Sequence, residues 1–158
     1  MEHQDPPLDE GEGEDTRYPP LFISHGSPMT ALEPGAAGAF WQDLGRVAQA
    51  RSAAGGRLPR AFVALSAHTL ARQPTTLSAA RHAAIHDFGG FPPALSALRY
   101  DVAGAPELAP YVEQLLQWCG IDVTHSDAGG LDHGIWTPLR SIRPQADVPV
   151  LPVAYPAD

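Results

Sequence analysis

The sequence has little cysteine, little positive charge and no long apolar run. Its one cysteine, Cys119, excludes an internal disulfide and is typical of a protein in a reducing compartment. No apolar run reaches the roughly 20 residues that a membrane-spanning helix needs, and the N-terminus lacks the basic and apolar regions of a secretory signal. Ten lysines and arginines stand against 18 acidic residues, and the formal net charge is −8. We therefore expect a cytoplasmic protein without a nucleic-acid or membrane partner.

Two common catalytic motifs are also missing. The chain has no glycine-rich phosphate-binding loop and no Gly-x-Ser-x-Gly nucleophile elbow. The tetrad Ser-His-Gly-Ser at 24–27 suggests a serine hydrolase at first sight, but neither serine lies in the strand–turn–helix context that such an elbow requires. We therefore do not expect a serine nucleophile.

Length and composition are those of one globular domain preceded by an acidic tail. The chain has 158 residues, of which 44% are hydrophobic and 18% charged, enough for one buried core. Residues 1–19 are strongly acidic and have almost no apolar side chains, so they cannot offset the entropy of ordering. We expect a disordered tail over 1–19, with an acidic interaction arm as the alternative, and a domain over 20–158.

Two apolar runs each end in a histidine. Residues 21–24 lead to His25, which Gly26 follows, and residues 61–67 lead to His68. Such runs are typical of buried parallel strands, and open α/β sheets carry their ligand sites at the C-terminal ends of these strands. If the two strands are parallel and adjacent, both imidazoles reach one edge of the sheet. Because neutral imidazole is the commonest metal ligand, we predict a metal site there; two ordinary hydrogen-bonded histidines are the alternative.

The remaining pattern predicts an α/β fold with a mainly parallel central sheet flanked by helices. Cys119 lies on an apolar helical stripe and is expected in the core. The chain ends after a strand and before any covering helix, so we expect the fold to be incomplete at the C-terminus. The expected helices are 34–53, 106–120 and 134–142, and the expected strands are 20–24, 60–66, 75–78, 122–124 and 148–155.

The other histidines have weaker sequence contexts. Residues 81–93 form a candidate binding loop in which Asp87 either orients the imidazole of His86 or makes a simple loop hydrogen bond. His133 follows Asp132 between glycines, and its spacing suits a third metal ligand, a residue behind the ligands or a substrate contact. The histidines at positions 3, 82 and 125 have no supporting context, and we expect them to be exposed.

Five motifs spread over about residues 20–150 carry a family resemblance. They are Leu-Phe-Ile-Ser-His-Gly-Ser-Pro-Met at 21–29, Ala-Leu-Glu-Pro-Gly at 31–35, Leu-Ser-Ala-His at 65–68, Ile-His-Asp-Phe-Gly-Gly-Phe-Pro at 85–92 and Gly-Leu-Asp-His-Gly-Ile-Trp-Thr-Pro-Leu at 130–139. Their joint occurrence in this order resembles the class III extradiol ring-cleavage dioxygenases. Within that superfamily the chain is similar to the DOPA 4,5-dioxygenases.

The resemblance implies a non-haem metal enzyme that opens catechol-type rings with O₂ at a bond next to the diol. His25 and His68 match the family's two N-terminal metal ligands, and His133 matches its active-site Asp-His-Gly histidine, which is expected to be catalytic. We also expect His86 and Asp132 to contact the substrate. Fe(II) is the expected cofactor because a partly open coordination sphere leaves positions for a catecholate and O₂. Zn(II) fits the same ligands without the redox chemistry.

The resemblance also implies a missing part. Members of the family continue past Tyr155, and the continuing segment supplies their remaining metal ligand and catalytic histidine. We therefore expect a C-terminally truncated chain with impaired activity. Its last strand, residues 148–155, would have an uncovered face or edge through which copies self-associate. The alternatives are a non-catalytic remnant, a subunit that needs a partner chain, and a zinc-dependent hydrolase built on the same histidines.

Overall fold

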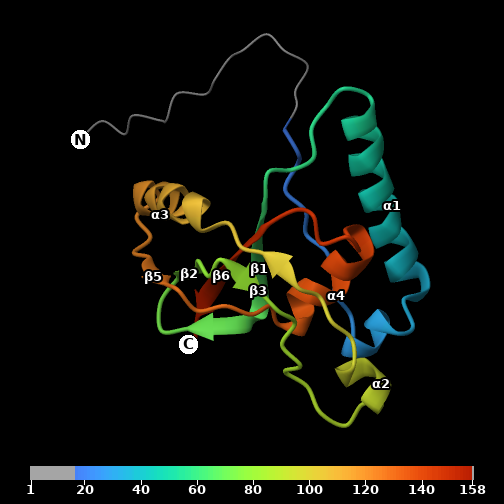
Figure 1. Ribbon diagram of the computed structural model, residues 1–158. Coiled ribbons are helices and arrows are strands. Elements are labelled where there is room, and N and C mark those ends of the chain that lie inside the picture. The colour runs from blue at the N-terminus through green and yellow to red at the C-terminus, as the bar shows by residue number, and fades with distance from the viewer. Residues whose placement is uncertain (1–16, 158) are drawn as a thin grey trace.

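A four-stranded sheet organises residues 17–157, the part of the chain that the computed structural model describes (Figure 1). The expected acidic tail falls almost entirely outside these residues. No helix in the described part is long and apolar enough to cross a membrane. The helical elements are η1 (Pro28–Ala31), α1 (Gly35–Ala53), α2 (Pro93–Ser96), η2 (Pro106–Leu108), α3 (Ala109–Trp118) and α4 (His133–Ile142). The strands are β1 (Phe62–Ala71), β2 (Thr75–Leu77), β3 (Arg81–His82), β4 (Val102–Ala103), β5 (Thr124–Ser126) and β6 (Val150–Pro156).

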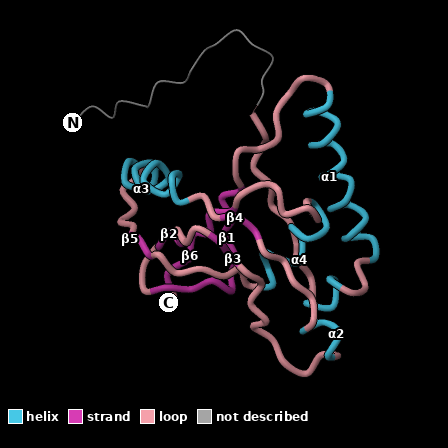
Figure 2. Tube along the Cα trace, viewed as in Figure 1, coloured by secondary structure: helices cyan, strands magenta, loops and turns pink. Residues whose placement is uncertain are grey.

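The strands of the main sheet follow the order β1-β6-β2-β5 (Figure 2). β1 and β6 are parallel, and so are β2 and β5, whereas β2 and β6 are antiparallel. β3 and β4 form a separate antiparallel pair. The predicted α/β fold with a mainly parallel sheet is confirmed.

β6 lies at the centre of the core because both of its faces are buried. Consecutive side chains of a strand point to opposite faces. Val150 belongs to a cluster with Trp41 of α1 and Trp136 of α4, whereas Leu151 packs with Ala109 of α3. Figure 1 shows α1 and α4 on one side of the sheet and α3 on the other. Each fully buried large apolar side chain of this kind contributes about 1.5–3 kcal/mol.

The first predicted strand is wrong. Residues 20–24 pair with no strand in the described part of the chain, and Phe22 is fully exposed. A strand needs a neighbour with free backbone groups in register, and Pro20 has no N–H to donate to one. The second strand also differs from the prediction, because β1 does not end before His68 but runs through it. His25 and His68 are therefore not on equivalent, adjacent parallel strands.

Two expectations about exposure are also wrong. The last strand has no uncovered edge, because β6 lies between β1 and β2 and residues 150–154 are buried. The strands at the two edges of the sheet are β1 and β5, and Val63 and Leu65 of β1 are exposed. Cys119 is exposed rather than in the core, because α3 ends at Trp118 and the cysteine lies beyond its packed turns.

His82, expected at the surface, is buried in β3 with 2% of its area exposed. Its Nδ1 accepts a hydrogen bond from the Gly130 N–H at 3.2 Å, which ties β3 to the loop before α4. Burial is the main cause that lowers the pKa of His82 from its ordinary value of 6.5, since burial penalises the charged ring. A protonated ring could not accept this hydrogen bond, so the folded chain requires the neutral form.

We predict that His82 makes the protein less stable in acid. Its folded-state pKa is lowered, so the unfolded chain binds the proton first. The contribution of neutral His82 to the free energy of unfolding is therefore complete above pH 6.5. It is lost as the pH falls from 6.5 through the lowered pKa. In His82→Asn, whose amide oxygen can still accept from Gly130, the free energy of unfolding should fall less between about pH 7 and pH 5. Urea denaturation across this range measures it, and an unchanged pH dependence would contradict the prediction.

The matched control has the opposite sign. Hydrogen bonding to Glu113 raises the pKa of His125, so His125 stabilises the fold below its raised pKa and this contribution is lost as the pH rises through that pKa. Replacing it by His125→Gln should steepen the loss of stability in acid, whereas His82→Asn should flatten it.

α4 starts so close to β1 that Gly134 has no room for a side chain. A Cβ atom at Gly134 would lie 2.5 Å from Ser66 Oγ and 3.2 Å from His68 Cδ2, both on β1. Glycine therefore allows the first turn of α4 to rest directly on the strand that carries His68.

We predict that Gly134→Ala lowers the free energy of unfolding by about 1–3 kcal/mol, the usual cost of overpacking a close contact. Gly89→Ala is the matched control, because a Cβ at Gly89 would meet no atom within 4 Å. Urea denaturation of both variants gives the comparison, and equal stabilities would contradict the prediction.

Candidate metal centre

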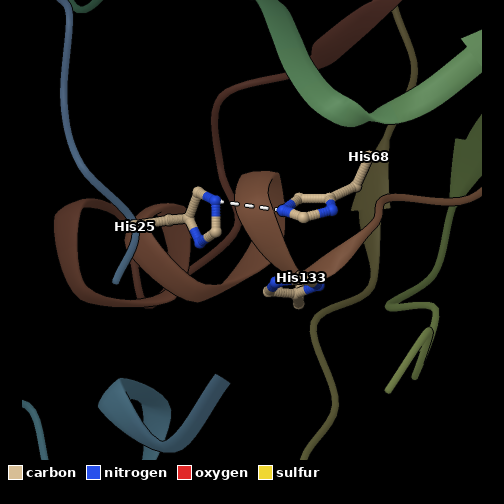
Figure 3. A group of neighbouring side chains, drawn as sticks. All are labelled: His25, His68 and His133. Atoms are coloured by element: carbon tan, nitrogen blue, oxygen red, sulfur yellow. Dashed lines mark hydrogen bonds between the residues drawn. The ribbon is translucent and has the colours of Figure 1, made fainter. Parts of the chain in front are cut away.

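Three histidines from three distant segments converge at the edge of the sheet (Figure 3). The Nε2 atoms of His25 and His68 are 3.2 Å apart. The ring centroid of His133 lies 4.9 Å from that of His25 and 4.2 Å from that of His68. One ring nitrogen from each residue falls within 4.8 Å of the other two. His68 is exposed, His25 is half-buried and His133 is buried, so the cluster opens to solvent on one side.

His25 is held by a sharp change of direction rather than by a strand. Gly26 has a φ of +66°, a conformation that favours glycine, and it bends the chain immediately after His25. The side chain of Ser27 then caps η1 by accepting a hydrogen bond from the Met29 N–H at 3.3 Å. Ile23, two residues before the histidine, packs against the main core. The sequence motif therefore supplies an anchor to the core at Ile23, a candidate metal ligand at His25 and a turn at Gly26.

His68 lies on an irregularity of β1. Leu65 pairs with Val153 and Leu70 with Tyr155, so residues 66–69 bulge out of the ladder with β6. Such bulges re-aim side chains and are common next to active sites. Ser66 Oγ accepts a hydrogen bond from the His68 N–H at 3.2 Å, which fixes the bulge from within.

Asp132 joins this bulge to the start of α4. Its Oδ1 accepts hydrogen bonds from the Ser66 hydroxyl and from the Gly134 N–H, each at 2.7 Å, and its Oδ2 accepts one from the Thr69 hydroxyl. The residue is 3% exposed and is the N-cap of α4. Both carboxylate oxygens are thus engaged within the chain, and Asp132 positions the elements that carry His68 and His133.

His133 is oriented by Asp87. The carboxylate of Asp87 accepts the backbone N–H of His133 at 3.0 Å and lies 3.0 Å from its Nδ1. The hydrogen bonds from His133 outweigh the opposing effect of burial and lower the pKa of the Asp87 carboxyl. Asp87 therefore remains ionised and holds the imidazole by a charge-assisted contact.

His86 points away from the three histidines, although the next residue, Asp87, contacts one of them, His133. The Nε2 of His86 lies 3.1 Å from the Leu98 carbonyl oxygen, and its ring is 5.7 Å from both Phe88 and Trp136. Phe88 lies in turn 5.9 Å from the His133 ring. His86 thus backs an aromatic wall beside the histidines. Asp87 does orient an imidazole, but it is that of His133, whereas His86 makes a hydrogen-bond contact with a loop carbonyl.

Sequence reasoning missed the residues that support the histidines. Ser66, Thr69 and Asp87 make the hydrogen bonds described above, yet none belongs to a recognisable ligand spacing. The available signal was their sequence proximity to candidate histidines, since Ser66 lies two residues before His68. Proximity alone does not reveal which carboxylate faces which ring.

The donor set fits one divalent cation. Two imidazole nitrogens bound to a common metal at about 2.0–2.1 Å lie about 3 Å apart, close to the 3.2 Å between His25 and His68. Burial, followed by the neighbouring His133 and His68, lowers the pKa of His25, which keeps the ring neutral as a ligand must be. Among residues 17–157, the group that contains His25 and His68 has His133 as its third member and no carboxylate.

A second polar cluster, formed by Ser78, Glu113 and His125, lies at β2 and β5, away from the metal centre. His125 Nε2 is 2.7 Å from Ser78 Oγ, and its Nδ1 is 2.9 Å from a Glu113 carboxylate oxygen of α3. This order of side chains is that of a serine-hydrolase triad. However, Ser78 is only 5% exposed and its hydroxyl also lies 3.1 Å from the Ser126 carbonyl oxygen. We interpret the cluster as a clamp that holds α3 against the sheet.

Comparison with known proteins agrees with this site. Residues 19–157 match the family described as the catalytic LigB subunit of aromatic ring-opening dioxygenase. Two curated relatives are named 4,5-DOPA dioxygenase extradiol. The one from Escherichia coli (strain K12) is 39% identical over 86% of this chain and 47% of its own length. The one from Beta vulgaris is 35% identical over 87% of this chain and 50% of its own length.

A solved structure has a similar fold over most of this chain. An uncharacterized protein from Escherichia coli K12 aligns with a TM-score of 0.51 and 29% identity, over 75% of this chain and 39% of that protein. The chain spans about half the length of the curated relatives that it matches. Because the family match covers nearly every described residue and the motifs of the site lie within it, the chain belongs to the LigB family of aromatic ring-opening dioxygenases, and within that family it is similar to the 4,5-DOPA dioxygenases.

Proposed function

We propose that this chain contributes the metal-binding histidines of an extradiol dioxygenase that opens catechol-type rings with O₂. The observation that carries the proposal is the convergence of His25 and His68, with Nε2 atoms 3.2 Å apart, beside the buried ring of His133. The names of the curated relatives support a catechol such as DOPA as substrate. They favour neither a zinc hydrolase nor a non-catalytic remnant. A cytoplasmic location remains part of the proposal. Self-association is also proposed, but through the exposed apolar side chains of β1 instead of residues 148–155.

In this proposal His25 and His68 hold the metal and His133 acts on the substrate. Fe(II) at this position would supply open coordination sites for a catecholate and O₂; Zn(II) would bind the same nitrogens but could not exchange electrons. As the diol binds, a phenolic proton must leave, and the Nε2 of His133 is the proposed acceptor. The aromatic wall of Phe88 and Trp136 excludes water from one side of the His133 ring.

The sequence predicts that Asp132 and His86 contact the substrate, but in this proposal both act indirectly, because Asp132 is engaged within the chain and His86 faces the Leu98 carbonyl. Asp132 keeps the bulge of β1 and the first turn of α4 in register through the hydrogen bonds from Ser66 and Gly134. His86 keeps the ring of Phe88 against the site from behind. We propose that both shape the region in which the catechol binds.

The function is tested by Fe(II)-dependent O₂ uptake with DOPA or catechol, followed together with the absorbance of the yellow ring-opened product. We expect slow turnover, because the group that contains His25 and His68 has no carboxylate among the described residues and the relatives are about twice as long. A chromophoric catechol such as 4-nitrocatechol tests substrate binding without turnover, through the shift of its absorption when it ionises at the metal. The proposal would be contradicted if neither signal depended on His25 and His68.

We predict that His25→Ala and His68→Ala each weaken Fe(II) or Zn(II) binding more than about tenfold. Loss of a residue behind a ligand already costs about 10–100-fold in affinity, and loss of a ligand should cost at least as much. Isothermal titration under anaerobic conditions gives the affinities. His125→Ala is the control, because that histidine belongs to the clamp with Ser78 and should leave metal binding unchanged. If all three variants bound the metal as tightly as the unsubstituted chain, His25 and His68 would not be its ligands.

We predict a different effect for His133→Ala. Loss of general-base assistance typically lowers turnover by about 10²–10⁴, whereas metal content should remain near that of the unsubstituted chain. Metal analysis and O₂ uptake on the same preparation separate the two quantities. If metal and activity fall together, His133 is a ligand and its proposed role is wrong.

A further inference from the structure

We infer that Asp87 is a positioning residue that fixes the tautomer of His133 and thereby leaves the Nε2 of that ring free for chemistry. The inference rests on the role proposed above for His133. It concerns a residue of the motif at 85–92 that is neither an expected metal ligand nor an expected substrate contact, and it can be tested without turnover.

Asp87 contacts His133 through both of its carboxylate oxygens. One carboxylate oxygen accepts the backbone N–H of His133, and the other lies 3.0 Å from Nδ1 of the same residue. An ionised carboxylate has only acceptors, so Nδ1 must carry the hydrogen. A neutral imidazole has one hydrogen, and the Nε2 of His133 therefore keeps its lone pair. The side chain of His133 is 9% exposed and that of Asp87 is 25% exposed, so the contact is shielded from water mainly on the histidine side.

The backbone around Asp87 makes its position independent of the histidine ring. The Ile85 N–H donates to the Leu131 carbonyl at 2.7 Å, and the Leu131 N–H donates to the Ala83 carbonyl at 2.9 Å. Trp136 Nε1 of α4 also donates to the Ile85 carbonyl at 3.0 Å. These bonds hold the segment that carries Asp87 beside the segment that leads into His133. The position of the Asp87 carboxylate is thus fixed by hydrogen bonds that do not involve the His133 ring.

The free Nε2 is what the proposed chemistry requires. The ring of His133 lies 4.2 Å from that of His68 and 4.9 Å from that of His25, centroid to centroid. A base in this position can accept a proton from a diol held at the two ligands only through an unprotonated nitrogen. The other tautomer would present an N–H to the diol and could not act as its base.

A metal-ligand role for Asp87 is the competing assignment. Ligand atoms of Asp87, Asp132 and His133 lie within 4.8 Å of one another. However, the oxygens of Asp87 face two N–H donors of His133, and those of Asp132 face the hydroxyls of Ser66 and Thr69. A cation would have to displace several of these bonds, so we assign Asp87 to the imidazole.

Asp87→Asn in the full chain is the decisive variant. An amide offers one acceptor oxygen and one NH₂ donor where the carboxylate offered two acceptors. The backbone N–H of His133 cannot change, so it takes the oxygen, and the NH₂ then faces Nδ1. Nδ1 must become the acceptor, and the hydrogen moves to Nε2. The variant should therefore reverse the tautomer while it keeps the shape of the site.

The measurement is the nitrogen chemical shifts of the His133 ring by NMR on the metal-free, ¹⁵N-labelled chain at about pH 8, above the ordinary imidazole pKa. We expect Nδ1–H in the unsubstituted chain and Nε2–H in Asp87→Asn. Asp122→Asn, an exposed aspartate with the same charge change, should leave the His133 signals unchanged. Thermal unfolding by circular dichroism verifies that the variants are folded. The Nε2–H tautomer in the unsubstituted chain, or the same tautomer in both chains, would overturn the inference.

The second readout is turnover against metal affinity. Asp87→Asn should lower turnover at least tenfold and change Fe(II) affinity by less than threefold, whereas a ligand role would lower affinity in proportion. Asp87→Glu, which restores two acceptors, should recover the Nδ1–H tautomer if its longer side chain reaches the ring; an Nε2–H tautomer in a folded Asp87→Glu chain would count against the inference. If the unsubstituted chain shows no turnover at all, the proposed function fails, and the tautomer measurement still decides the role of Asp87.

Discussion

The buried carboxylate of Asp132 is the interaction on which the site depends. An ionised group cannot be buried without compensation, and here two hydroxyls of β1 and one N–H of α4 surround it. The carboxylate also lies at the N-terminus of α4, where the helix dipole favours negative charge. The bulge that carries His68 and the turn that carries His133 therefore have one relative position. The absence of a side chain at Gly134 allows the two to meet.

A second carboxylate acts one step further out. Asp132 fixes where His133 begins, and Asp87 fixes how its ring is turned. The two aspartates come from segments 45 residues apart, and the loop of Asp87 is attached to the Asp132 segment through backbone bonds of Ile85 and Leu131. Metal-binding imidazoles are usually supported in this way by hydrogen-bonded groups behind them. The chemistry of the histidines is thus set by residues that touch no proposed ligand of the metal.

The sheet supports this arrangement from below. β6 is buried on both faces and pairs with β1 along one edge, so the bulge of β1 lies next to the buried, interior strand of the sheet. α1 and α4 cover one face, and the tryptophans of both helices, Trp41 and Trp136, are buried in the same cluster. By contrast, Val63 and Leu65 on the outer strand remain exposed. The centre is therefore well anchored on its inner side and open on its outer side.

The sequence by itself determined the class of fold, most of the helices and the chemistry-bearing histidines. Apolar periodicity located α1 almost to the residue, because that pattern is set by which helix face is buried, and the helix expected over 134–142 agrees with α4 to within one residue. The two apolar runs that end in histidine pointed to His25 and His68, and the family motifs added His133. The strand expected over 20–24 failed because an apolar run does not reveal whether a neighbour has free backbone groups to pair with it. His82 and Cys119 were misplaced for a similar reason, since burial of a single side chain depends on what packs against it.

Only the tertiary structure decided how the histidines meet. His25 arrives from an unpaired segment, His68 from a bulge and His133 from a helix start, and no sequence period links these three settings. The partner of Asp87 was likewise undetermined, because a carboxylate hydrogen-bonds to whichever donors the fold brings near it. Local composition fixes what a residue can do, whereas long-range packing fixes which residues face each other. For this chain the motifs supply the reactive side chains, and the contact between α4 and β1 decides which of them face each other.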